Sequence, residues 1–168
     1  MSQAQVPTFV LNRQLLSLKG DLWIDDPQGN HVFLVRGQYV SLRDVHTLVD
    51  ERGTEYYTIS RSLAHVHRTF EIKHGEQIVA TIEQALLTFM GDRFKISMAN
   101  GTELQVQGDW IDRDFHVTSG GQDVIRASRH LLSIRDAYGI QMAPGFDIPL
   151  GIAIVVALEQ MEMEGRQG

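Results

Sequence analysis

The sequence predicts one largely antiparallel β domain. Turn signals recur at fairly even intervals along its 168 residues, and the stretches between them alternate apolar with polar side chains. Period-2 alternation on both sides of a tight turn is typical of a hairpin with one buried face. No linker or low-complexity stretch divides the chain, so we expect a single domain over residues 1–168 with a substantial core.

Five short segments favour tight turns. Residues 26–29 read Asp-Pro-Gln-Gly, which places Asp, Pro and Gly where a type I turn prefers them. Residues 50–53 keep the Asp and Gly of this pattern without the proline. Glycine-containing pairs follow at 74–75, 100–101 and 120–121, and the Asn-Gly pair is a strong hairpin signal because both residues accept positive φ. The five turns predict five hairpins.

The flanks of these turns alternate as strands do. Before the Asn-Gly turn, Phe94, Ile96 and Met98 point to one side and their polar neighbours to the other. After the turn, Leu104 and Val106 alternate with polar residues in the same way. Further alternating stretches lie at residues 70–72, 78–82, 115–117 and 138–142.

The segment 150–158 breaks this rule because it is apolar on every side. It is either a strand buried on both faces or a helix enclosed all round. Its β-branched residues favour a strand, whereas Asp147 as an N-cap and Pro149 in a first turn favour a helix. The segment has no polar face to lie in a membrane interface and about half of the length that a bilayer crossing needs. We therefore expect it in the core, with Gly151 allowing a close approach of its surroundings.

Several short motifs, taken in order, resemble the LURP-one-related family. The opening Trp23-Ile24-Asp25, the turn after it and residues 32–37 are similar to the first hairpin of that family. Later stretches fall in the order that the family shows, at residues 41–44, 49–53, 59–61, 70–72, 108–110 and 136–139. The similarity covers roughly residues 9 to 162 and rests on order and spacing, since each motif is short.

The resemblance implies a mainly β (α+β) fold. In this fold a closed antiparallel β-barrel of about 12 strands, over about residues 9–143, surrounds a central hydrophobic C-terminal helix at about residues 147–162. It thus favours the helix for the apolar segment. Tubby C-terminal domains, which bind phosphoinositides, and scramblase-like proteins, which act at membranes, share the fold. Many LURP-one-related members have no established activity, and a shared fold does not imply a shared function.

The composition excludes some classes of function. The chain has no cysteine, which removes disulfides, cysteine nucleophiles, thiolate metal sites and the cysteine-rich segment of scramblases. The net charge of −6 argues against a general nucleic-acid binder, because such proteins place cations against phosphates. Residues 1–7 lack the pattern of a signal peptide, and no stretch is long enough for a transmembrane segment. We therefore expect a soluble, cytoplasmic protein.

The candidate site residues are Arg61, His65, His67 and Arg68. The first three stand at even offsets, so an extended chain would place them on one face. The functional hypothesis is a site for an anion or lipid headgroup, because arginine binds phosphate through a bidentate fork. The two histidines could alternatively be metal ligands. The commoner outcome for such a pattern is a solvated strand face or a hairpin rim. If these cations pair with carboxylates in the fold, the lipid hypothesis loses its only support in the sequence.

Two further charged groups are expected to be ordinary surface features. They are the basic residues Arg126, Arg129, His130 and Arg135, and the acidic residues Asp109, Asp112 and Asp114. The basic residues do not share one face, and Asp123 and Asp136 lie close enough in sequence to neutralise them. The spacing of the acidic residues is not that of a calcium loop, and Arg113 offers charge relief. Trp110 is expected to pack into a corner of the barrel.

The sequence contains no nucleophile elbow, phosphate loop, dinucleotide fingerprint or zinc-protease helix motif. We therefore predict that the protein is not an enzyme and that it holds no cofactor or metal. The leading interpretation is a non-catalytic binding or adaptor module of unidentified ligand or protein partner. The first alternative is peripheral binding of an anionic, phosphoinositide-like membrane lipid. The second is an enzyme with an unrecognised site.

Overall fold

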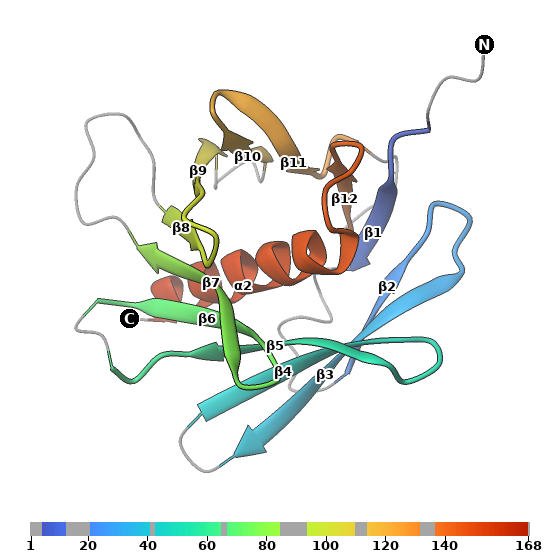
Figure 1. The fold of residues 1–168 in the computed structure, drawn as a ribbon. Helices are drawn as coiled ribbons and strands as arrows, with labels where there is room; N and C mark the ends of the chain where they lie inside the picture. The colour runs from blue at the N-terminus through green and yellow to red at the C-terminus, as the bar shows by residue number, and fades with distance from the viewer. Residues whose placement is uncertain are drawn as a thin grey trace.

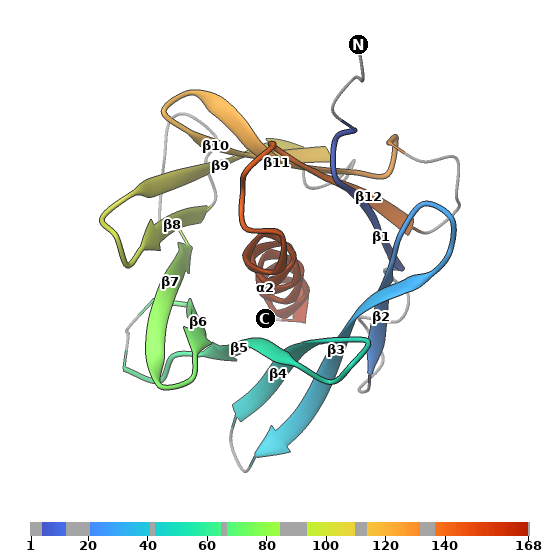
Figure 2. The same ribbon diagram turned by 45° about the vertical axis from the view of Figure 1, so that its right-hand side comes forward.

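The computed structural model describes residues 5–12, 21–40, 43–64, 67–84, 94–109, 114–131 and 137–167. In these residues twelve strands form one closed antiparallel barrel, and a C-terminal helix lies along its interior (Figures 1 and 2). The fold that the resemblance implied is therefore confirmed. The elements in chain order are β1 (Thr8–Asn12), β2 (Leu22–Asp25), β3 (His31–Val40), β4 (Arg43–Asp50), β5 (Glu55–Arg61), β6 (Thr69–His74), β7 (Gln77–Gln84), β8 (Phe94–Met98), β9 (Glu103–Asp109), β10 (Asp114–Ser119), β11 (Gln122–Ser128), β12 (Ala137–Met142) and α2 (Ile148–Gln167).

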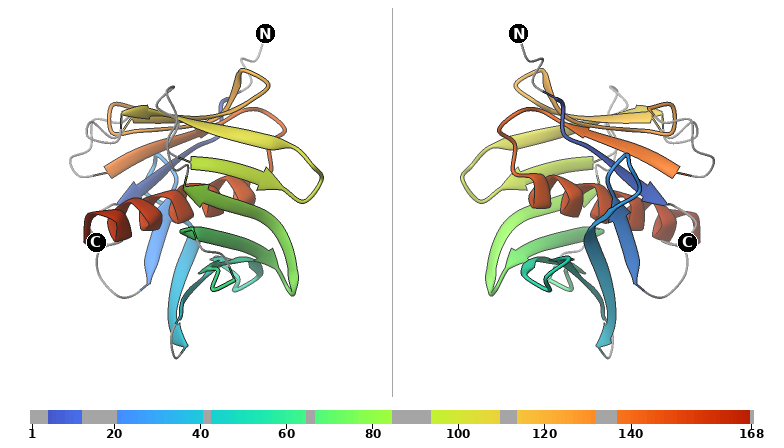
Figure 3. Two further views of the ribbon diagram at one scale, coloured as in Figure 1. Left: turned by 90° about the vertical axis from the view of Figure 1, so that its left-hand side faces the viewer. Right: turned by 90° about the vertical axis from the view of Figure 1, so that its right-hand side faces the viewer.

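The topology is the simplest one for an antiparallel barrel. Each strand pairs with the next strand in sequence, and the barrel closes where β1 pairs with β12, with Phe9 opposite Ile140. Because the strands run up and down in turn, alternate connections lie at opposite ends of the barrel. The five tight turns therefore lie at the end where α2 enters, and the C-terminus lies at the opposite end, where α2 leaves the barrel (Figure 3).

All five predicted hairpins are confirmed: they join β2 to β3, β4 to β5, β6 to β7, β8 to β9 and β10 to β11. Each turn contains at least one glycine with positive φ, such as Gly29 at 88° and Gly53 at 85°. The leading aspartates fix the first two turns. Oδ1 of Asp26 accepts hydrogen bonds from the backbone N–H groups of Gln28 and Asn30, both at 2.9 Å. Turn chemistry in the sequence is thus sufficient to set the strand connections at this end.

The apolar segment is a helix. Oδ1 of Asp147 accepts a hydrogen bond from the backbone N–H of Leu150 at 3.0 Å, the contact expected of an N-cap residue. The helix begins at Ile148 and continues five residues beyond the predicted end at 162. Its side chains from 152 to 158 are all 0% exposed, because the strands of the barrel surround the helix (Figure 2). Local propensity, which favours strands for β-branched residues, is overridden here by this enclosure.

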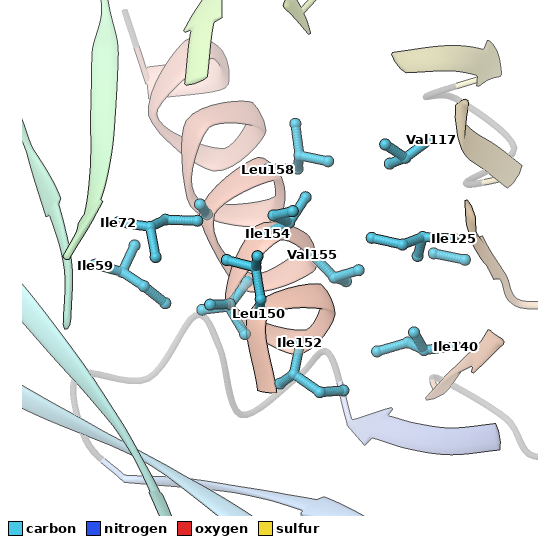
Figure 4. Packing of buried hydrophobic residues seen from close by; sticks show 14 of the residues in the cluster. Ile59, Ile72, Val117, Ile125, Ile140, Leu150, Ile152, Ile154, Val155 and Leu158 are labelled. Atoms are coloured by element: carbon cyan, nitrogen blue, oxygen red, sulfur yellow. The ribbon is translucent and has the colours of Figure 1, made fainter. Parts of the chain in front are cut away.

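The inward faces of the strands complete the core. Ile59 and Ile72 pack against one side of α2, and Val117, Ile125 and Ile140 lie on the other (Figure 4). Each buried aliphatic side chain of this kind contributes about 1.5–3 kcal/mol to the free energy of folding. The interior of the barrel is therefore a packed apolar core around α2.

Two glycines are placed where a side chain would collide with the wall. A Cβ on Gly151 would lie 2.5 Å from Sδ and 2.6 Å from Cε of Met142, so the predicted close approach occurs between α2 and β12. Gly108 in β9 lies opposite Phe115 in β10 and has a φ of 150°. A Cβ there would lie 2.5 Å from Cα of Phe115, so only glycine allows these two strands to pair at this point.

Candidate functional site

Three of the four predicted basic residues are described, and they lie at the end of β5 and just before β6. Arg61 is the last residue of β5, and His67 and Arg68 come just before β6, which begins at Thr69. Both strand ends lie at the rim of the barrel at the end where α2 leaves. His67 is exposed there, whereas His65 lies outside the described residues.

The structure brings Arg61 and Arg68 together across this rim. Nη1 of Arg61 and Nε of Arg68 each lie 3.8 Å from the same atom, Oε2 of Glu164 near the end of α2. Nη1 of Arg68 also donates a hydrogen bond to the carbonyl oxygen of Met161 at 3.3 Å. The two arginines therefore face the helix end as well as the solvent.

The sharing of Glu164 makes the neutralisation of the two arginines partial. The side chains of Arg61, Arg68 and Glu164 are 53%, 23% and 34% exposed, so solvent screens both ion pairs. Pairs of this exposure contribute about 0–1 kcal/mol each to stability. Within the described residues that form these ion pairs, one negative charge faces two positive charges, so the three side chains together carry a net charge of one positive unit.

The entry end of the helix is fixed by a tyrosine that the sequence did not single out. The hydroxyl of Tyr57 in β5 donates a hydrogen bond to Oδ2 of Asp147 at 2.9 Å. Burial, followed by the hydrogen bond to Asp147, raises the pKa of Tyr57 to about 12. The ring of His74 lies against Tyr57 edge to face, with the ring centroids 5.9 Å apart. The strand β5 thus carries residues that contact both ends of α2. Tyr57 and Asp147 are 90 positions apart in the sequence, so local sequence patterns could not predict their hydrogen bond.

A second group lies on the outer face of the first hairpin. The exposed indole of Trp23 in β2 stacks on the imidazole of His31 in β3, with the ring centroids 4.4 Å apart and the planes inclined by 12°. Nδ1 of His31 is hydrogen-bonded to the carboxylate of Asp25. These three residues are neighbours because the hairpin pairs β2 with β3, and the Asp-Pro-Gln-Gly turn and the resemblance to the first hairpin of a known family both predicted that pairing.

The two charged groups expected to be ordinary surface features are only partly described. Asp109 and Asp114 lie opposite each other across β9 and β10, and Oδ1 of Asp114 lies 3.9 Å from Nε of Arg126. Asp123 is hydrogen-bonded to His116 at 2.9 Å rather than to an arginine. Outside the described residues lie Trp110, Asp112, Arg113, Arg135 and Asp136.

Within the described ranges, no three histidine or acidic side chains gather closely enough to hold a metal ion. Over the same ranges, no helix combines the length and the apolar character needed to cross a bilayer.

Comparisons with known proteins agree with the fold. The LURP-one-related family matches residues 7–159. The chain is 26% identical to the uncharacterised protein YxjI of Bacillus subtilis, over 90% of this chain and 91% of that protein. It is 23% identical to protein LURP-one-related 15 of Arabidopsis thaliana, over 92% of this chain and 79% of that protein. A crystal structure of an Arabidopsis thaliana protein superposes with a TM-score of 0.66 at 18% identity, over 94% of this chain and 91% of that one.

Proposed function

Because this chain belongs to the LURP-one-related family and its own helix fills its barrel, we propose that it is a non-catalytic binding or adaptor module that binds its ligand on its outer surface. The observation that carries the proposal is the burial of α2. Side chains 152–158 are 0% exposed and are packed by apolar side chains of the wall. A ligand inside the barrel would have to replace this core, whereas the turns, the rim and the strand faces are open to partners.

The absence of catalysis is part of the proposal. Two histidine–carboxylate hydrogen bonds in the described part of the chain, His31 with Asp25 and His116 with Asp123, lie on the outer faces of strands. Catalytic groups gain their strength from sites that exclude water, where hydrogen bonds and charges act in a low dielectric. These two pairs are open to water, so we assign them a structural role on the surface rather than a catalytic one.

Native mass spectrometry of the purified protein tests whether the interior is closed to ligands. A mass equal to that of the sequence supports binding on the outer surface. An additional apolar molecule that is retained in the folded protein and released on unfolding would show that the barrel holds a ligand beside α2, and would overturn the proposal.

The second candidate function is peripheral binding of an anionic membrane lipid at the rim between β5 and β6. Both arginines pair with Glu164, so the sequence pattern alone no longer supports this candidate. The observation that favours it is that Arg61 and Arg68 converge on a single shared carboxylate. The attraction of two such cations to an anionic surface is worth about 1 kcal/mol each and weakens as salt is added.

Co-sedimentation with neutral, phosphatidylserine-containing and phosphoinositide-containing vesicles at two salt concentrations tests this candidate. Salt-sensitive binding to the anionic vesicles, lost in the double variant Arg61→Glu/Arg68→Glu, would place lipid binding first, provided that the variant still unfolds cooperatively. If the wild-type protein stays in the supernatant at low salt, the lipid candidate is removed. A protein partner, identified by pull-down, would then be the remaining candidate ligand.

A further inference from the structure

The exit end of α2 places one carboxylate oxygen between two guanidinium groups. Arg61 and Arg68 come from either side of the β5–β6 connection, and both reach Oε2 of Glu164 at 3.8 Å. Two like charges repel each other, and an anion placed between them offsets that repulsion. Glu164 supplies that anion from within the chain, and it supplies one charge against two.

The same contact leaves hydrogen-bonding capacity unused. Nε of Arg68 and Oε2 of Glu164 are both buried atoms that make no hydrogen bond. A guanidinium group offers five N–H donors, and one Nη1–H of Arg68 donates to the carbonyl oxygen of Met161. A phosphate monoester carries nearly two charges and three strong acceptor oxygens, so it can accept bonds from both arginines. It matches the charge and the donors of the arginine pair better than one carboxylate oxygen at 3.8 Å does.

Glu164 can leave its position without disturbing the core. It lies three residues beyond Met161, the last side chain of α2 with 0% exposure among those that the structure describes. Its own side chain is 34% exposed. Rotation about its side-chain bonds moves the carboxylate into solvent while the helix stays in the barrel.

We propose that Arg61 and Arg68 form a binding site for a phosphate monoester group, and that Glu164 occupies this site as an internal competitor that the ligand displaces. The proposal rests on the second candidate function, recognition of an anion at this rim. It adds the chemistry of the ligand and the residue that controls access. Soluble phosphorylated compounds and lipid headgroups both carry this group.

A titration with inorganic phosphate at constant ionic strength, with chloride as the replaced anion, tests the site. The NMR signals of the arginine Nε–H groups report binding. Glu164→Gln removes the competing charge and is expected to bind phosphate several-fold more tightly than the wild type. Glu162→Gln makes the same change of net charge at the same end of α2 and is expected to bind as the wild type does. Adding Arg61→Ala to Glu164→Gln is expected to abolish the gain.

Equal phosphate affinities of the Glu164→Gln and Glu162→Gln proteins would overturn the proposal, because the gain would then follow net charge alone. Each variant is first shown to unfold cooperatively. Cooperative unfolding with wild-type stability confirms that the arginine pair, rather than the fold, has been altered.

Vesicles distinguish the two sources of the phosphate group. A gain by Glu164→Gln on vesicles with phosphatidylinositol 4-phosphate, but not on vesicles with phosphatidylserine, assigns the site to a lipid headgroup. A gain in the phosphate titration alone assigns it to a soluble compound, and shows that the lipid candidate fails while the site stands. A gain in neither assay overturns the site. Native mass spectrometry tests binding at the outer surface independently, so the absence of a gain in both assays would not contradict that proposal.

Discussion

The substitution Gly108→Ala is expected to lower the free energy of unfolding by about 4 kcal/mol. A Cβ at this position would lie 2.5 Å from Cα and 2.8 Å from Cβ of Phe115, and closer still to the carbonyl oxygen of Asp114. These are mostly backbone atoms of the paired strand, so they cannot rotate away. Overpacking costs about 1–3 kcal/mol, and holding alanine at a φ of 150° adds about 1–3 kcal/mol.

Thermal and urea unfolding, followed by circular dichroism, measure this loss. For a chain of this length, about 4 kcal/mol corresponds to a fall in Tm of roughly 8–16 °C. Gly101→Ala is the matched control, because Gly101 has a φ of 88° and no atom within 4 Å of an added Cβ. Only the strained backbone remains there, at about 1–2 kcal/mol. Equal losses in the two variants would refute the steric argument and the register of Gly108 opposite Phe115.

Three further substitutions test the helix and the turns. Val155→Asp buries an unpaired charge in the core and is expected to abolish cooperative unfolding. Val6→Asp is the control, because Val6 is 45% exposed and the variant is expected to unfold cooperatively. A soluble Val155→Asp protein that melts cooperatively would contradict the central position of the helix. Tyr57→Phe removes the bond to Asp147 and is expected to cost about 1 kcal/mol at neutral pH. The raised pKa of Tyr57 means that the unfolded state loses its phenol proton first, so wild-type stability should fall between about pH 10 and 12, and the fall should be smaller in the variant when Tm is measured across this range. Hydrogen bonds from the turn, that of the Thr54 backbone first, hold the pKa of Asp50 below its usual value. The stability that the Asp50 carboxylate contributes is therefore present at neutral pH and is lost as the pH falls below about 4. Asp50→Asn should reduce this loss at acid pH, and a dependence of Tm on acid pH that is the same in the variant and the wild type would contradict this role of Asp50.

The sequence was informative where structure is decided locally. The turns at 26–29 and 50–53 carry their own chemistry in Asp and Gly, so their hairpins could be predicted without knowledge of the rest of the chain. The helix could not be predicted in this way, because a segment apolar on every side carries no periodicity. Its resemblance to a family of barrels supplied what the local pattern lacked.

The candidate site was predicted less completely. Arg61 and Arg68 were singled out from the sequence, and the structure shows that Arg61 is the last residue of β5 while Arg68 precedes β6. The carboxylate that they share, Glu164, lies about a hundred residues further along the chain, at the end of a helix whose direction only the closed barrel determines. Contacts that depend on closure of the barrel cannot be predicted from local sequence patterns.

The central helix has a consequence for how the protein is made. The element that fills the core, α2, follows all twelve strands in the chain, and β1 finds its second neighbour only when β12 has appeared. At synthesis rates of 5–20 residues per second, the first strand waits roughly 8–30 s for the helix that will cover its apolar side. During that time the nascent chain carries an uncovered apolar surface and two open sheet edges, the features that chaperones recognise and that drive aggregation. Synthesis that stalls shortly before residue 148 should therefore leave a chain that carries every strand of the barrel but cannot become a stable barrel.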